Sequence, residues 1–100
     1  MEEETFLGRK KEEVILYSGL MEQGGTLIFY DKGFHIKYND ESIKAPYSYI
    51  TEIEKMSDAG LGTVKIRLVA FDMFGNKYDL RLVMPDDSYA KLKKLRELSE

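Results

Sequence analysis

The stretch "GTLIFYDKGFHIKYND", residues 25–40, contains two extended segments on either side of a tight turn. Segment 26–30 is almost continuously apolar, which predicts a strand that is covered on both faces. Segment 34–38 alternates apolar and polar residues, so one of its faces is expected to point into a core. Between them, Asp-Lys-Gly places Gly33 where a three-residue hairpin needs a left-handed residue. The stretch therefore predicts a β-hairpin in the wall of a small β-sheet domain.

Similar alternation and turn residues recur on both sides of this hairpin. They predict seven short strands, over residues 12–20, 26–30, 34–38, 43–47, 49–57, 63–72 and 77–84. The glycine-containing segments 21–25 and 58–62 are expected to be connections, and a bulge is expected between Ile50 and Ile53. Pro46 lacks an amide proton, so the fourth strand is expected to lie at a sheet edge or to end there. The short connections favour antiparallel neighbours.

The period of the sequence changes after Pro85, which ends the last predicted strand. Asp86 or Asp87 is expected to cap a helix by accepting a backbone hydrogen bond. The apolar residues that follow recur at a helical interval, at Tyr89, Leu92, Leu95 and Leu98. Each would stabilise the fold by about 1.5–3 kcal/mol if fully buried, before entropy costs. The order of elements predicts a mainly β (α+β) domain, in which a seven-stranded antiparallel sheet is bent into a partly open barrel and capped by a C-terminal amphipathic helix.

The 100 residues fit one domain, which we expect to span residues 12–100 after a flexible or loosely helical lead-in at residues 1–11. With 43% hydrophobic and 33% charged residues, the composition is that of a globular chain. The net charge of -3 argues against nucleic acid as a partner, because a nucleic-acid surface needs a strongly positive face. The chain has no cysteine, its first residues are charged, and no stretch approaches the roughly 20 apolar residues of a membrane span. We therefore expect a cytoplasmic protein.

Four segments within residues 12–98 carry a resemblance to a known family. They read "GTLIFYDKGFHI", "IKAPYSYITEIEK", "VKIRLVAFDMFGNKYDLRL" and "YAKLKKLREL". In this order they resemble the pleckstrin-homology-like (PH-like) superfold, and most closely its GRAM-like and bacterial members, which implies a bent sheet closed by a helix. Phosphoinositide-binding members usually carry several basic residues near the first strand–strand loop, whereas "LMEQGGT", residues 20–26, has none. The resemblance therefore implies that the usual inositol-phosphate pocket is missing.

Candidates for catalysis or metal binding are few. His35 is the only histidine, and its outward position without a nucleophile motif favours a surface histidine over a general base. Glu52 and Glu54 share a strand face and can be read as an acid–base pair or as a solvated face, which we favour. One histidine with scattered carboxylates has no recognisable metal-ligand spacing. We therefore expect no enzyme, and no catalytic site, metal, cofactor or small-molecule substrate.

The candidate contact surface begins at the hairpin tip "MFG", residues 73–75. Met73 and Phe74 stand side by side where polar residues are usual, with Phe71 on the outward side nearby. Exposed apolar clusters often mark partner or membrane contacts. Three alternatives are open for this tip: it folds back over the barrel mouth or under the N-terminal segment, it forms an oligomer contact, or it inserts into a membrane.

The second part of the candidate surface is the basic stretch "KLKKLR", residues 91–96. It puts four cations, Lys91 and Lys94 among them, on the solvent side of the predicted helix. This face is either simply solvated, which is the default, or it contacts an acidic partner or anionic lipid.

These observations predict a non-enzymatic interaction module with a PH/GRAM-like fold. It would bind a protein segment or associate with itself, by adding a strand at an open sheet edge or by docking against the helix. The alternative is peripheral binding to an anionic membrane, through the hairpin tip at residues 71–76 and the basic face of the last helix.

Overall fold

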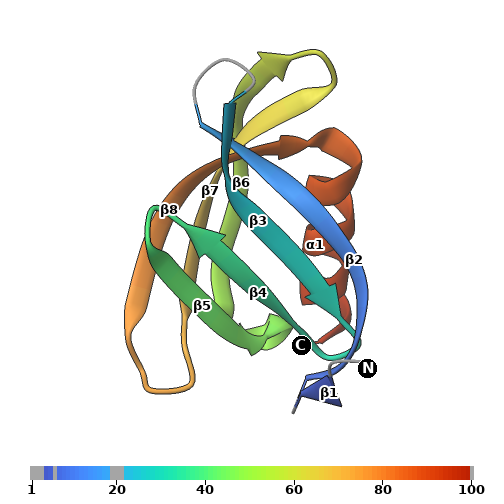
Figure 1. Cartoon of the computed structure of the whole chain (residues 1–100), viewed down its shortest axis with the longest axis vertical. Coiled ribbons are helices and arrows are strands. Elements are labelled where there is room, and N and C mark those ends of the chain that lie inside the picture. Colours follow the sequence, from blue (N-terminus) through green and yellow to red (C-terminus); the bar gives the residue numbers. More distant parts are fainter. Residues whose placement is uncertain (1–3, 6, 19–21, 100) are drawn as a thin grey trace.

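The computed structural model describes residues 4–5, 7–18 and 22–99 of the chain. The elements in chain order are β1 (Glu4–Thr5), β2 (Gly8–Ser18), β3 (Glu22–Tyr30), β4 (Gly33–Tyr38), β5 (Glu41–Pro46), the 3-10 turn η1 (Tyr47–Tyr49), β6 (Ile50–Gly60), β7 (Thr63–Phe71), β8 (Lys77–Pro85) and α1 (Asp86–Leu98). Seven strands form one open antiparallel sheet in the order β5-β4-β3-β2-β8-β7-β6, and the short β1 pairs with β2 outside this path (Figure 1). The prediction of a mainly β fold with seven antiparallel strands and a C-terminal helix is confirmed.

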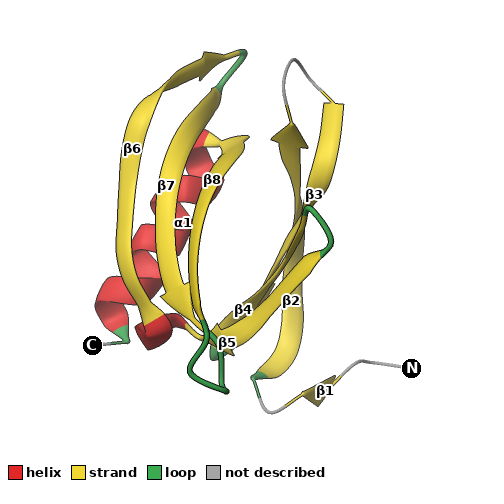
Figure 2. Cartoon of the chain, turned by 90° about the vertical axis from the view of Figure 1, so that its left-hand side faces the viewer, coloured by secondary structure: helices red, strands yellow, loops and turns green. Residues whose placement is uncertain are grey.

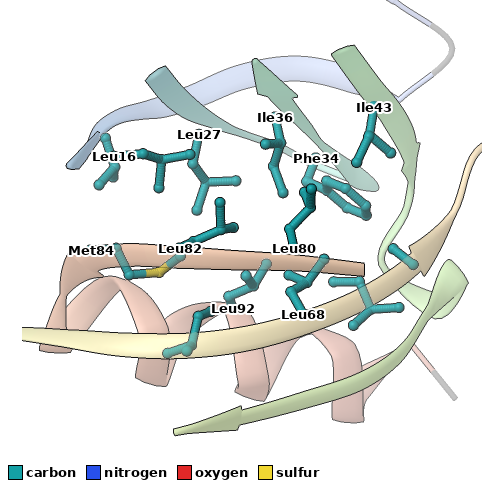
Figure 3. Packing of buried hydrophobic residues seen from close by; sticks show 14 of the residues in the cluster. Leu16, Leu27, Phe34, Ile36, Ile43, Leu68, Leu80, Leu82, Met84 and Leu92 are labelled. Carbon is teal, nitrogen blue, oxygen red and sulfur yellow. The ribbon is translucent and has the colours of Figure 1, made fainter. Parts of the chain in front are cut away.

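The sheet bends so that its two halves, β2–β5 and β6–β8, face each other (Figure 2). The halves are joined where Tyr17 of β2 pairs with Val83 of β8. The apolar side chains of alternate strand positions fill the space between them. Those that meet there are Leu16, Leu27, Phe34, Ile36 and Ile43 from the first half and Leu68, Leu80, Leu82 and Met84 from the second (Figure 3). Alternation in the sequence therefore placed the core correctly.

Helix α1 closes one open side of the bent sheet. Leu92 is fully buried in the core, and Tyr89 and Leu95 pack partly against it. Leu98 is 72% exposed, so the expectation that all four apolar residues of the stripe face the core is wrong at the last one. Leu98 lies in the last turn of the helix, after the three residues that pack on the core. In the described part of the chain, no helix combines the length and the apolar character that a membrane crossing requires.

The start of α1 differs from the prediction as well. Pro85 ends β8, as expected, and itself occupies the N-cap position. Asp86 and Asp87 lie in the first turn, and no side chain makes a capping hydrogen bond. The predicted aspartate cap is therefore wrong, although both carboxylates still favour this end of the helix through its dipole.

In the hairpin at residues 25–40, segment 26–30 is covered on both faces as expected, but the turn is built differently. Ile28 and Tyr30 are buried on the outer face of β3, where Leu7 packs on them. The turn consists of two residues, Asp31 and Lys32, whose amides donate to the carbonyls of Arg9 (3.1 Å) and Leu7 (2.8 Å). Gly33 does not have a positive φ, so the predicted left-handed glycine is wrong. Glycine is required there because a Cβ would collide with the Ala45 carbonyl and the Leu7 side chain.

The two glycine-containing connections are shorter than expected. Gly24 and Gly25 lie within β3, and Gly25 is needed because a Cβ would meet the Lys37 carbonyl. β6 continues to Gly60, so the second connection is only the two-residue turn of Leu61 and Gly62. Both expected loops are therefore largely strand. In the first, close strand contact explains the glycines. In the second, Gly60 and Gly62 have positive φ and no atom near an added Cβ, so they are turn glycines as predicted.

The edges of the sheet are as predicted, but its first strand begins earlier than expected. β5 is an edge strand and ends at Pro46, as predicted, and the register of β6 shifts between Ile50 and Glu52, as expected for a bulge. The lead-in is extended and not helical in its described part, because β1 pairs with β2 and β2 already begins at Gly8. The first strand therefore starts before the predicted boundary at residue 12.

Candidate functional site

The connection between β7 and β8 is organised by one carboxylate. Asp72 is 8% exposed. It accepts hydrogen bonds from the backbone amides of Phe74 (2.8 Å) and Asn76 (2.9 Å), from Asn76 Nδ2 (3.0 Å) and from the Tyr78 hydroxyl (3.0 Å). Its own amide donates to the Asn76 carbonyl at 3.0 Å, and Gly75, with φ +86°, donates to the Asp72 carbonyl at 3.2 Å. These six bonds fix the conformation of the loop.

The electrostatics of the loop favour an ionised Asp72. Burial disfavours the charged form, but the hydrogen bonds from Asn76, Phe74 and Tyr78 outweigh it and hold the pKa of the carboxyl below its ordinary value. The hydrogen bond to Asp72 in turn raises the pKa of the Tyr78 hydroxyl. At neutral pH the loop is therefore held by a carboxylate that accepts bonds and by a phenol that donates one.

The loop displays apolar side chains to solvent. Phe74 is 90% exposed and Met73 is 46% exposed, while Phe71 at the end of β7 is half-buried. The alternative in which this tip folds back over the barrel mouth is therefore wrong for Phe74. A large aromatic side chain on a fixed loop loses little conformational freedom when a partner covers it, which is the property of an interface anchor.

The two lysines of the candidate surface lie elsewhere. Lys91 Nζ is 3.0 Å from Glu12 Oε1 and 5.0 Å from the centre of the Phe29 ring, so it ties α1 to β2 and β3. Lys94 is exposed one turn further along the helix. Figure 1 shows α1 and the β7–β8 connection on different sides of the molecule. The structure therefore does not bring Phe74 together with Lys91 and Lys94 on one face.

The polar residues considered for catalysis are engaged with neighbours. His35 Nε2 lies 2.7 Å from the Ser42 hydroxyl on the outer face of β4 and β5. Glu52 pairs with Arg67 at 3.0 Å, and Arg67 also binds Asp79 at 2.9 Å. In the ranges 7–18 and 22–99, no three acidic or histidine side chains converge as a metal-ligand group. The ion pairs of Arg67 with Glu52 and Asp79 agree with the prediction that Glu52 and Glu54 lie on a solvated strand face.

Two features of the surface were not found from the sequence. The side-chain amide and carboxylate pattern of the loop, Asp72 with Asn76 four residues later, is a turn signal that could have identified Asp72 as its organiser. Leu61, in the turn between β6 and β7, has a φ of +52° and is 83% exposed. The dipeptide Leu-Gly does not predict a positive φ at Leu61, because two-residue turns of this type normally carry Asn-Gly or Asp-Gly.

No protein-family model matches the chain, and no curated protein matches its sequence. Its function is therefore to be sought in the residues of the site, since a fold by itself does not define one.

Proposed function

We propose that this chain is a non-enzymatic interaction module of PH-like architecture, which binds a protein partner or a second copy of itself through the β7–β8 connection. The main support for the proposal is the exposure of Phe74. Its side chain is 90% exposed, on a loop that the buried Asp72 holds in place. A buried carboxylate with four accepted hydrogen bonds is an elaborate support for a loop that displays an aromatic ring. Such support is what pre-organised recognition requires.

A protein partner is favoured over a membrane because of where the charges lie. Peripheral membrane binding combines apolar insertion with cations at the same surface. Here Lys91 pairs with Glu12, and α1 lies on a different side of the molecule from the loop (Figure 1). An anionic membrane could therefore not meet both parts of the candidate surface at once. A cytoplasmic location is part of the same proposal and agrees with a chain that has no cysteine.

Replacing Phe74 by serine tests the proposal. Leu98→Ser is the matched control, because Leu98 is also a large apolar side chain with 72% exposure and lies on α1 away from the loop. Sedimentation velocity at rising concentration measures self-association of each purified chain. Quantitative mass spectrometry of proteins retained from a lysate of the source cells measures binding to a partner. We expect the wild type to show either self-association or binding to a partner, and Leu98→Ser to behave in the same way. In Phe74→Ser this association should be weakened at least about tenfold, because truncation of an aromatic anchor costs about 2 kcal/mol or more.

Three results would overturn the proposal. The first is a Phe74→Ser chain that associates as the wild type does. The second is a wild type that stays monomeric and retains no protein at a stoichiometric level. The third is flotation with phosphatidylserine vesicles that depends on Phe74 and on low salt, which would assign the loop to a membrane instead.

A further inference from the structure

The two edges of the sheet differ in how well they could pair with another strand. The register of β6 with β7 is broken in three places, and bulges of this kind obstruct further pairing. At its start, Arg96 donates from Nε to the Ile50 carbonyl (2.7 Å) and from a terminal nitrogen to the Thr51 carbonyl (3.0 Å). Further along, the ion pair between Lys55 and Asp58 (2.8 Å) adds charge beside the edge. Arg96 therefore occupies the first two carbonyls of β6, and the rest of this edge is irregular, so β6 is the poorer edge for an added strand.

The opposite edge, β5, is regular. All six of its residues pair with β4 without a register shift. The turn between the two strands is Asn39 and Asp40, both with positive φ, which is a two-residue hairpin turn. In such a hairpin the residues next to the turn form a hydrogen-bonded pair and the pairs then alternate. The amides and carbonyls of Ser42 and Lys44 consequently point away from β4, toward the open side.

Those groups are available for pairing. Among the described residues, no backbone hydrogen bond outside the strand pairs involves Ser42 or Lys44. Pro46, the next residue of the outward set, has no amide proton, so it limits the pairing surface to the strand before it. A segment of about four or five residues would match this edge.

The side chains beside the edge specify what kind of segment fits. On the inner face of β5, Ile43 and Ala45 are fully buried, so the inward residues of an added strand would continue an apolar surface. On the outer face, Lys44 pairs with His35 in register, and Lys37 pairs with Ser42. Lys37 is exposed, and Lys44 Nζ lies 5.6 Å from the centre of the Tyr30 ring. An added strand would stand directly opposite Ser42 and Lys44, while Lys37 lies one strand further in on β4 and the Lys44 ammonium is turned toward Tyr30 of β3. The two cations make the outer face near this edge positive, which favours negative charge on the outward residues of an added strand.

We propose that β5 binds an extended segment of a protein partner in which apolar residues alternate with acidic ones, by adding that segment to the sheet. The inference rests on the proposed function in that the partner is a protein, but it uses a surface that does not include Phe74. The backbone of β5 supplies the affinity of strand addition, while Lys37 and Lys44 select acidic side chains at every second position.

The probe is a capped hexapeptide of alternating valine and glutamate, with a valine–lysine hexapeptide as its counterpart. Fluorescence anisotropy measures binding of each peptide to the full chain, and amide hydrogen exchange locates it. We expect the glutamate peptide to bind more tightly, with new protection at the amides of Ser42 and Lys44. In the double variant Lys37→Glu/Lys44→Glu, binding of the glutamate peptide should fall about tenfold, equivalent to about 1.4 kcal/mol, and the lysine peptide should now be preferred. Lys65→Glu, an exposed lysine on β7, is the matched charge control and should leave the preference unchanged.

A second pair of variants tests the backbone contact. Ser42→Pro removes the outward amide and should abolish peptide binding, whereas Ser42→Ala removes only the hydroxyl and should retain it. Equal binding of the two peptides, protection on β6 instead of β5, or full binding by Ser42→Pro would overturn the inference. Phe74→Ser should bind the glutamate peptide normally, so loss of the Phe74 contact and loss of the β5 contact are read separately.

Discussion

Leu92 is the residue on which the closure of the barrel depends. It is the fully buried leucine of α1, and it enters the core shared by both halves of the sheet. Truncation of a fully buried leucine to alanine removes its transfer free energy and leaves a cavity, at a cost of 2–5 kcal/mol in well-packed cores. Because the Leu92 site lies between a helix and two strand layers, it can collapse only partly, and we expect Leu92→Ala to lower the free energy of unfolding by about 3 kcal/mol.

Two other leucines of α1 allow the effect of burial on stability to be compared within the same helix. Leu95 is partly buried and should cost about 1 kcal/mol when truncated, whereas Leu98, at 72% exposure, should change stability by less than about 0.5 kcal/mol. Urea unfolding monitored by circular dichroism gives the three free energies, and equal slopes show that the unfolded states are comparable. In thermal unfolding, 1 kcal/mol corresponds to about 4–8 °C in a domain of this size, so Leu92→Ala should melt about 12–24 °C lower.

The opposite order would refute the reasoning. If Leu98→Ala destabilises as much as Leu92→Ala, the last turn of the helix is packed in solution and the closure is not centred on Leu92. If all three variants unfold like the wild type, α1 is not part of the cooperative core.

Three further predictions follow from local geometry. Leu61→Asn should raise the free energy of unfolding by about 0.5–1 kcal/mol, because Asn tolerates the positive φ at this position and with Gly62 gives a favoured turn; the urea midpoint measures it. Tyr47→Phe should lower the free energy of unfolding by about 1–2 kcal/mol, because the buried Tyr47 hydroxyl donates to the Tyr30 carbonyl at 2.7 Å. Since the pKa of Asp72 is lowered on folding, its contribution to stability is present above the ordinary pKa of Asp, roughly 4, and is lost as pH falls through the lowered value. The protection factors of the loop amides, which are exchange rates corrected for the intrinsic effect of pH, should therefore stay high at neutral pH and fall only below about pH 4.

Each of these has a clear contrary result. A destabilised Leu61→Asn would mean that the leucine contributes a contact that outweighs its backbone strain. A neutral Tyr47→Phe would mean that water or another donor serves the Tyr30 carbonyl. For the loop, Asp72→Asn is the control, and an unchanged pH profile in that variant would show that a different group titrates.

Much of the fold could be predicted because strand alternation and helical spacing are local properties of the chain. The turn between the strands predicted at 63–72 and 77–84, the edge position of Pro46 and the inward face of segment 34–38 could all be predicted in this way. The errors arose where a residue is determined by distant parts of the chain. Gly33 is needed because of Leu7 and Ala45, which no local pattern reveals. The exposure of Leu98 depends on where the sheet ends, which helical spacing does not contain.

The candidate site was predictable to a similar extent. Two adjacent apolar residues at a hairpin tip identified Met73 and Phe74, and the structure places both at the surface. Their separation from Lys91 could not be predicted, because it depends on how the helix crosses the bent sheet. The role of Asp72 depends on a hydrogen-bond geometry that composition alone does not specify.

The two edges of the sheet differ for two reasons, the position of α1 beside the start of β6 and the irregular register of β6 with β7. β6 follows β5 after a single 3-10 turn, so its first carbonyls come within reach of Arg96 on the helix. A strand added to β6 would have to displace these charge-assisted hydrogen bonds and straighten three irregularities of register. A strand added to β5 meets six regularly paired residues. Although β6 has 11 residues and β5 only six, the cost of pairing favours the shorter edge, and strand length is therefore a poor guide to which edge would accept an added strand.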